Sequence, residues 1–207
     1  MAAVADKILR RVRSKGRGKW VCTPKDFLDL GNRSSVDKAL SRLVKNGDLR
    51  RVGRGFYDMP RFSKILGHFA VVDAYSAVAA IVRRDGIRIM DNGMACANKL
   101  GLTNAVSVKL DYIIDGATRN VEVGGFPIYL QYAGSRALFW FGKKSASVAI
   151  ALLWLGPYAS QDRRVVPTLR QTLPDDVKKE LAQNSAHLPG WAASIVRDVV
   201  DARAEAA

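Results

Sequence analysis

The chain has 207 residues, enough for one large domain or two small ones. Hydrophobic residues make up 48% of it, which excludes an intrinsically disordered protein. Lys and Arg number 33 against 19 Asp and Glu, a formal net charge of +14. Such an excess attracts polyanions, so nucleic acid is the first partner to consider and an anionic membrane surface the second.

The positive charge is concentrated near the N-terminus. The segment up to Pro60 holds 15 basic and 6 acidic residues, a net charge of +9, whereas residues 61–207 have a net charge of +5. Less than a third of the chain therefore carries most of the charge. This asymmetry predicts a basic N-terminal module joined to a more neutral domain.

Three features favour a cytoplasmic location. The two cysteines, Cys22 and Cys96, form neither a disulfide framework nor a metal-ligand cluster, and an isolated cysteine in a reducing compartment is usually a small buried hydrophobe. The first residues lack the uninterrupted apolar core of a signal peptide. The most apolar run, Ala146 to Leu155, is about half the ~20 residues that span a bilayer. We expect a soluble protein without a membrane partner.

Residues 34–46 have the pattern of a short amphipathic helix. The apolar residues recur at helical spacing and form one stripe: Val36, Ala39, Leu40, Leu43 and Val44. The opposite side carries four polar residues: Ser35, Lys38, Arg42 and Lys45. Ser34 or Ser35 is expected to cap the first turn, and Gly47 to end the helix. A capped helix with a basic outer face suits the major groove of DNA, although a solvated surface helix shows the same pattern.

The preceding segments complete a helix-turn-helix. Residues 4–13 are predicted to form a helix, and residues 19–22 a short strand. Thr23 before Pro24 predicts the start of a second, short helix that runs to Leu30, because threonine caps helices and proline is favoured at their first position. A tight turn at residues 31–33 then leads into the basic helix. Helix, short helix, turn and basic helix is the order of a helix-turn-helix.

The residues after the basic helix predict a wing. Residues 49–52 and 56–59 have strand composition, and Gly53-Arg54-Gly55 between them predicts a hairpin tip. Glycines on both sides let the backbone approach closely, so Arg54 is placed to reach a phosphate or a minor groove. The sequence thus predicts a DNA-binding winged helix-turn-helix over residues 1–60.

The rest of the chain predicts a linker at residues 61–69 and a larger mixed α+β domain at residues 70–207. Helices are expected at residues 71–84, 92–100, 145–155, about 167–173, 174–184 and 189–204. Strands are expected at residues 87–90, 106–114, 119–123, 126–132 and 136–141. Apolar residues alternate along residues 106–114, which predicts a strand with one buried face. The expected fold class is therefore α+β, with an N-terminal winged helix-turn-helix followed by this domain.

No residue pattern makes a case for an enzyme, a metal site or a cofactor. Residues 142–145, Gly-Lys-Lys-Ser, resemble the end of a phosphate-binding loop, but Ala137 stands where that loop needs a glycine. Asp111 and Asp115 are four residues apart, yet Asp115 belongs to an Asp-Gly turn. The two histidines are far apart and have no Cys or His companion, so ordinary packing or surface roles are expected for His68 and His187.

A cluster of aromatic residues raises a second possibility. Exposed aromatic rings on a sheet can stack RNA bases, whereas buried ones simply form a core. The cluster consists of Tyr129, Tyr132, Phe139, Trp140 and Phe141. A buried sheet core is the simpler explanation, and RNA binding through the basic N-terminus and these rings remains the alternative.

The basic helix and the wing also resemble a known family. Ala39 to Leu49, followed by Arg50 to Tyr57 and by Pro60, is similar to the signature of the AbiEi antitoxins of bacterial toxin–antitoxin operons. That resemblance covers some twenty residues and implies a winged helix-turn-helix ahead of an antitoxin domain. It further implies an autorepressor that binds repeated promoter sites and counteracts a nucleotidyltransferase-type toxin, generally without a stable complex. The nearest alternative is a direct inhibitor of the toxin for which DNA binding is secondary.

The expected function is that of a transcriptional autorepressor and antitoxin, not an enzyme. Ser35, Lys38, Arg42 and Lys45 are predicted to face the major groove, with Arg33 at its edge. Arg51 and Arg54 are predicted to contact the backbone or the minor groove from the wing. Phosphate contacts are predicted for Arg10, Arg11 and Arg17. Which of these side chains reads bases does not follow from the sequence, because phosphate contacts position a protein whereas base contacts specify its site.

Overall fold

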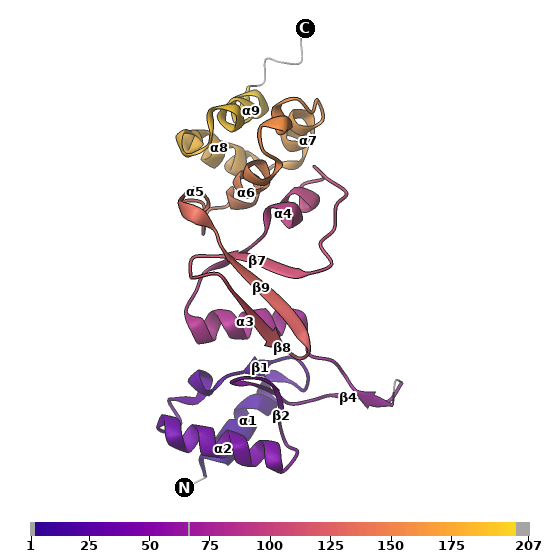
Figure 1. Ribbon diagram of the computed structural model, residues 1–207, viewed down its shortest axis with the longest axis vertical. Helices are drawn as coiled ribbons and strands as arrows, with labels where there is room; N and C mark the ends of the chain where they lie inside the picture. The colour runs from indigo at the N-terminus through magenta and orange to yellow at the C-terminus, as the bar shows by residue number, and fades with distance from the viewer. Residues whose placement is uncertain (1–2, 66, 202–207) are drawn as a thin grey trace. The chain divides into compact units, whose positions relative to one another are not determined.

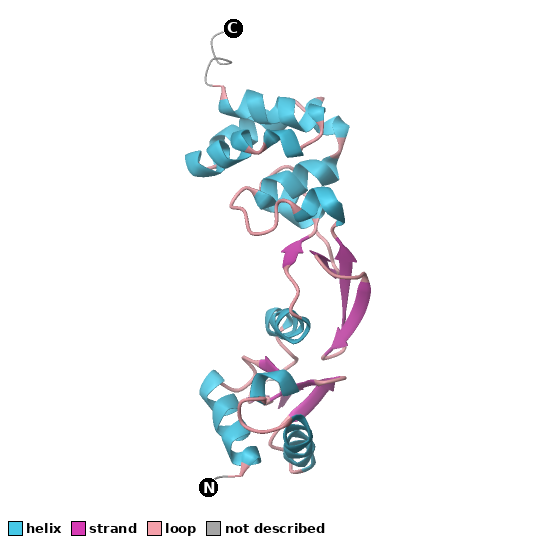
Figure 2. Ribbon diagram, turned by 90° about the vertical axis from the view of Figure 1, so that its left-hand side faces the viewer, coloured by secondary structure: helices cyan, strands magenta, loops and turns pink. Residues whose placement is uncertain are grey.

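The computed structural model describes residues 3–65 and 67–201, and it confirms the predicted α+β class (Figure 1). Helices and strands both occur along the chain (Figure 2). The chain divides into two compact units, one built from residues 1–87 and 120–128 and the other from residues 88–119 and 129–207. No helix in the described ranges combines the length and the apolar character needed to cross a membrane.

The first unit begins with the elements expected from the sequence. In chain order the unit contains α1 (Val4–Lys15), β1 (Val21–Cys22), the 3-10 helix η1 (Pro24–Phe27), α2 (Arg33–Lys45), β2 (Arg50–Gly53), β3 (Phe56–Asp58), β4 (Phe62–Ser63), β5 (His68–Phe69) and α3 (Ala74–Asp85), of which β4 and β5 were not expected. Strands β1, β3 and β2 form an antiparallel sheet in that order. The second short helix, expected to run to Leu30, is a 3-10 helix that ends at Phe27.

The core of this unit holds α2 against α1. Ile8 and Val12 of α1 are completely buried, as are Val36 and Leu40 of α2 and Phe27 of η1, and all five belong to one apolar cluster. Burying an aliphatic or aromatic side chain of this size contributes about 1.5–3 kcal/mol each. The packing therefore fixes which side of α2 faces outward.

The ends of η1 and α2 are set by local hydrogen bonds. Thr23 and Asp26 form a capping box, in which the Asp26 carboxylate accepts from the Thr23 backbone N–H at 2.8 Å. The cap of α2 was predicted at the wrong residue: Asn32, not Ser34 or Ser35, accepts from the Ser35 backbone N–H at 2.9 Å. The asparagine amide oxygen serves as well as a serine hydroxyl in this role.

The C-terminus of α2 closes as predicted at Gly47. Its φ of +76° is the left-handed conformation that glycine adopts without strain. Its N–H donates to the Val44 carbonyl at 3.0 Å, and the Asp48 N–H donates to the Leu43 carbonyl at 2.9 Å. These two bonds form a Schellman motif, which ends the helix in a fixed direction ahead of β2.

The first unit extends beyond the boundary expected near residue 60. α3 belongs to it: the Ser76 hydroxyl accepts from the Val21 N–H at 2.6 Å, and Arg83 donates to the Val21 carbonyl at 2.8 Å and to the Asp26 carboxylate at 3.0 Å. The segment 61–69, expected to be a linker, contains the β4–β5 hairpin. The place of α3 depends on contacts between residues more than fifty positions apart, which a residue pattern does not encode.

The second unit is richer in helices. Its elements in chain order are β6 (Ile89–Asp91), α4 (Gly93–Lys99), β7 (Leu110–Ile114), α5 (Gly134–Leu138), α6 (Ala146–Leu155), η2 (Pro157–Ser160), α7 (Val165–Thr172), α8 (Asp175–Gln183), η3 (Ser185–His187) and α9 (Gly190–Val200). β8 (Arg119–Val123) and β9 (Phe126–Tyr132) contribute residues to both units. The larger sheet has the strand order β6-β7-β9-β8. The last predicted helix reached Ala204, which lies outside the described residues.

One predicted strand was too long, and another was wrong. The strand expected at residues 106–114 begins only at Leu110, and Val106 and Val108 are 75% and 98% exposed, so their alternation does not mark a buried face. The strand expected at residues 136–141 is instead α5 and the helical turn after it. Short apolar and aromatic runs are compatible with either structure, and packing decides between them.

The main core of the second unit lies between α6 and the C-terminal helices. Leu152 of α6, Leu169 of α7, Leu181 of α8 and Ile195 of α9 meet in one buried cluster together with Trp140. α6 is apolar on nearly all sides because its neighbours cover it on several faces. Its apolar residues thus form the centre of the buried core of this unit.

The aromatic cluster does not form the buried sheet core expected for it. Trp140 and Phe141 are buried, but they lie in the turn after α5 and not on a strand, and Tyr132 is 52% exposed. The Phe139 ring stacks on the His187 ring, with centroids 3.5 Å apart, which gives this histidine the packing role expected. The tyrosines therefore lie on β9, whereas the other three rings lie in the turn after α5.

Both cysteines are free and buried, as predicted. Burial raises the pKa of the Cys96 thiol to about 11, and it raises the pKa of Cys22 further still. Both side chains are therefore neutral thiols at neutral pH. Inert thiols of this kind act as small hydrophobes.

The Gly-Lys-Lys-Ser segment leads into α6 and has a structural role. The Ser145 backbone N–H and hydroxyl both donate to one oxygen of Glu180 on α8, at 2.7 and 2.6 Å. Lys144 pairs with Asp176 at 2.7 Å. The start of α6 is therefore held by two carboxylates of α8.

This arrangement predicts an acid-sensitive contact. The bonds from Ser145 hold the pKa of Glu180 below its ordinary value of 4.5, so the carboxylate contributes stability above that pH and loses the contribution as the pH falls through its lower folded pKa. Glu180→Gln should lower the Tm at neutral pH, and the difference from the wild type should narrow below pH 4.5. Thermal unfolding followed by circular dichroism from pH 7 to pH 3 measures it. Glu122→Gln, on an exposed side chain, is the control. A Tm difference between Glu180→Gln and the wild type that stays constant from pH 7 to pH 3 would contradict the assignment.

Candidate nucleic-acid interface

The outer face of α2 carries a row of cations without acidic partners. Lys38, Arg42 and Lys45 are exposed, and within the described residues none of them forms an ion pair or a side-chain hydrogen bond. Their opposite face is the buried stripe of the helix, so these charges point away from the core. Ser41 lies exposed on the same helix and was missed by the sequence analysis, although its spacing of three from Lys38 would have identified it.

The first turn of α2 is less purely basic. Arg33 pairs with Asp37 one turn later, at 2.8 Å, and both side chains are largely exposed. An exposed pair of this kind is worth little and opens at small cost when a stronger anion approaches. Ser35 is half-buried, and its backbone N–H is used by the Asn32 cap. Arg33 and Ser35 therefore lie at the edge of the cationic face.

The hairpin of β2 and β3 presents Arg54 at its tip. Gly55 has a φ of +78°, which gives the tight reversal at the tip, and Arg54 beside it is exposed. The Arg84 guanidinium of α3 lies 4.3 Å from the centre of the ring of Phe56, the first residue of β3 after the tip. Arg51 is also exposed, on β2. The hairpin thus presents two exposed cations, Arg51 and Arg54.

The base of the hairpin is held by contacts that the sequence did not reveal. Arg50 makes two bonds to the Asp58 carboxylate across the strands, at 3.0 and 2.7 Å, and Asp58 is only 2% exposed. This partner raises the pKa of Arg50. Nearer the tip, a β-carbon at Gly53 would lie 2.6 Å from the backbone oxygen of Glu122, so only glycine fits there. The Arg50–Asp58 contact could have been predicted from the sequence, because opposite charges stand at the two ends of the predicted hairpin.

The arginines of α1 and of the turn after it divide into a structural one and exposed ones. Arg11 makes two bonds to the Asp29 carboxylate, at 2.8 and 2.6 Å, and a third to the Asp26 carbonyl at 2.7 Å. The pair raises the pKa of Arg11 and lowers that of Asp29. Arg11 therefore ties α1 to η1 and is already engaged, whereas Arg10 and Arg17 are exposed and have no partner within the described residues.

Arg17 lies at a second group of cations. It lines an open cavity of about 560 Å³ together with Lys19 and Arg61, at the base of the β4–β5 hairpin. The Gly18 backbone passes close to Arg61, with its N–H bonded to the Met59 carbonyl at 2.7 Å. Lys19 and Arg61 thus extend the predicted phosphate contacts, and Arg61 was missed because it fell in the segment expected to be a linker.

The structure therefore defines a class of protein: an α+β chain whose basic N-terminal unit braces a helix and a hairpin with exposed cations. The chain belongs to the family of unknown function DUF6088, which it matches over residues 7–180. The match runs from α1 to α8 and so includes parts of both units. No curated protein and no solved structure matches the chain.

The Arg50–Asp58 pair predicts a large loss of stability on removal of one partner. Arg50→Leu leaves the Asp58 carboxylate buried without its cation, and we expect a loss of about 2 kcal/mol in the free energy of unfolding, less than for a fully buried pair because Arg50 is partly exposed. Urea denaturation measures it. Arg51→Leu, one residue along the same strand, should stay within about 0.5 kcal/mol of the wild type. The double variant Arg50→Leu/Asp58→Leu should be more stable than Arg50→Leu alone; an equal or greater loss would contradict the pairing.

Proposed function

We propose that the protein binds duplex DNA through α2 and the β2–β3 hairpin and acts as a winged helix-turn-helix repressor. The observation that carries the proposal is the row of Lys38, Arg42 and Lys45, which are exposed and have no partner among the described residues, on a helix whose other face is buried. A helix of this width fits the major groove, where side chains reach base edges. Cations left without acidic partners favour an external polyanion.

The neighbouring cations fit the supporting contacts of such a complex. Arg54 at the hairpin tip is placed for a backbone or minor-groove contact, and Arg51 for the backbone. Arg10 and Arg17 supply phosphate contacts, with Arg33 at the edge of the groove after it leaves Asp37. Arg11, which was expected to contact phosphate as well, is assigned to bracing α1 because its guanidinium is bonded to Asp29. Binding through so many cations will weaken steeply with salt.

The resemblance to the AbiEi antitoxins extends the proposal to biological context. By that resemblance the protein represses its own operon by binding repeated promoter sites, and it counteracts a nucleotidyltransferase-type toxin through residues beyond the first unit. A toxin reading frame beside this gene would support the assignment. Direct inhibition of the toxin by contact, with DNA binding secondary, is the alternative within this context, and co-purification of the two proteins would favour it.

RNA binding through the aromatic cluster is the less favoured alternative. Stacking of bases needs several exposed rings on one surface. Trp140 is completely buried, Phe141 is 7% exposed, and the Phe139 ring is already stacked on His187. These rings therefore offer no common platform. Competition between the promoter duplex and a structured RNA of equal length separates the two functions.

The DNA-binding proposal predicts different effects for the helix and the hairpin. Arg42→Ala should lose ~1–3 kcal/mol of binding free energy and relax the preference at one base pair, whereas Arg54→Ala should weaken all sequences alike and reduce the slope of affinity against salt by about one. Fluorescence-anisotropy titrations with the promoter duplex and with a scrambled duplex, at several salt concentrations, measure both.

A matched control comes from the second unit. Arg163 is exposed and has no partner within the described residues, so Arg163→Ala removes the same charge from a surface outside the proposed interface. Its affinity for the promoter should be close to that of the wild type. Promoter affinity that is indifferent to Arg42→Ala and Arg54→Ala would exclude the proposed interface.

The antitoxin proposal predicts that repression and neutralisation separate. The triple variant Lys38→Ala/Arg42→Ala/Lys45→Ala should lose promoter repression in a reporter strain, because it removes the exposed cations of α2 without touching the buried stripe. It should still restore growth when the neighbouring toxin gene is induced, because neutralisation is assigned to later residues. Loss of both activities by a variant that folds normally would contradict this division, and failure of the wild type to restore growth would exclude the antitoxin role.

A further inference from the structure

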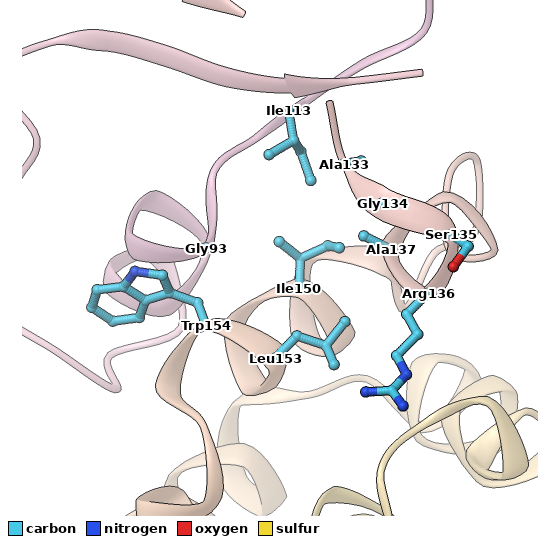
Figure 3. Close-up of a pocket in the computed structure, with 10 residues that line it drawn as sticks. All are labelled: Gly93, Ile113, Ala133, Gly134, Ser135, Arg136, Ala137, Ile150, Leu153 and Trp154. Carbon is cyan, nitrogen blue, oxygen red and sulfur yellow. The ribbon is translucent and has the colours of Figure 1, made fainter. Parts of the chain in front are cut away.

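The second unit contains a cavity whose lining residues have no part in the proposed DNA interface. Its volume is about 600 Å³, and its walls come from β7, α4, α5 and α6 (Figure 3). Ile113 of β7 points toward Ile150 of α6, and Leu153 of α6 and Ala137 of α5 complete the apolar part (Figure 3). A volume of 300–1,000 Å³ is the usual size of a small-molecule site.

The floor of the cavity is built from closely packed helices. A β-carbon at Gly93, at the start of α4, would overlap the β-carbon of Trp154, so the glycine allows α4 and α6 to meet directly. Ile150 is 4% exposed and belongs to a buried cluster with Cys96 and Ala97 of α4. The apolar wall therefore rests on a packed core and exists before any ligand binds. Pre-formed sites of this kind avoid the cost of ordering the protein on binding.

Among the described residues that line the cavity, the charged group and the hydroxyl group both belong to α5. Arg136 and Ser135 line it, and both are exposed. Arg136 forms no ion pair or side-chain hydrogen bond within the described residues, although many arginines of this chain are paired with a carboxylate. None of the described residues that line the cavity carries an acidic group. The lining thus offers a single cation and a hydroxyl beside an apolar surface.

We propose that this cavity binds a small amphipathic carboxylate. Its aliphatic or aromatic body lies between Ile113 and Ile150, and its carboxylate accepts hydrogen bonds from the Arg136 guanidinium, with the Ser135 hydroxyl as a second donor. Guanidinium and carboxylate match in geometry and form strong charge-assisted bonds. A cation is disfavoured by Arg136, and a neutral ligand leaves that charge unused. The inference is independent of the DNA-binding proposal because it rests on other residues.

Decanoate is a suitable probe because it combines one carboxylate with a flexible apolar chain. Isothermal titration of the full-length protein should show one saturable site per chain, and decyltrimethylammonium, with the same chain and the opposite charge, should bind at least tenfold more weakly. Arg136→Gln should lower decanoate affinity by roughly tenfold, the worth of one charge-assisted hydrogen bond. Arg136→Lys should recover part of it. Ser135→Trp, at the exposed rim, should block the site.

Controls locate the binding and test the charge. Arg163→Gln should leave decanoate affinity unchanged, and NMR shifts on titration should concentrate at residues 133–137 and 150–154. The exposed Phe62, Ile65 and Phe69 of the β4–β5 hairpin offer a competing apolar surface. Shifts centred on that hairpin, equal binding of the two probes, an affinity unaffected by Arg136→Gln, or no saturable binding would each overturn the proposal.

Discussion

The buried stripe of α2 is the constraint on which the first unit depends. Val36 and Leu40 have no exposed surface and pack with Ile8 and Val12 of α1 and with Phe27. A helix turned about its axis would expose these side chains at a cost of several kcal/mol in total. Because that rotation is fixed, the outward direction of Lys38, Arg42 and Lys45 is fixed too. The cationic face is therefore a consequence of apolar packing on the other side of the helix.

Arginine has two distinct uses in this unit, and they explain why net charge alone is a poor guide to an interface. Arg11, Arg50 and Arg83 are each bonded to a carboxylate and to a backbone carbonyl, and they join α1 to η1, β2 to β3 and α3 to the N-terminal elements. The planar guanidinium can serve several acceptors at once, which lysine cannot do in the same geometry. Lys38, Arg42 and Lys45 have no such partners in the part of the chain that the structure describes, so they remain available to an external anion.

The sequence predicted what local chemistry determines. The order of the elements up to Pro60, the Thr23–Pro24 helix start and the Gly47 helix end all rest on residues within a few positions of one another, and the structure confirms them. The sequence did not predict features that depend on contacts between residues far apart along the chain. α3 joins the first unit through Arg83 and Ser76, more than fifty residues from their partners.

Short ambiguous runs and surface cavities were equally inaccessible to sequence reasoning. Residues 136–141 are apolar and aromatic enough for a strand, but the burial of Trp140 and Phe141 beside helices decides for a helical turn. Of the candidate interface, all the exposed cations of α2 were predicted. Arg11 was predicted to contact phosphate, because its partner Asp29 is 18 residues away along the chain. Arg136 was not singled out at all, since nothing in its neighbours along the chain shows that it borders an apolar cavity.

The two proposed sites differ in the physical force that drives binding, and this difference makes them separable. Contacts between the α2 cations and a polyanion are exposed and are screened within a Debye length of about 8–10 Å at moderate salt. Binding in the cavity combines a single ionic contact with burial of apolar surface, and apolar burial is not screened by salt and is strengthened by excluded salts such as sulfate. Raising the ionic strength therefore weakens polyanion binding by α2 first and leaves much of the ligand binding in the cavity. Ligand binding that persists in high salt is therefore expected at the cavity lined by Ile113 and Ile150, and not at the basic face of α2.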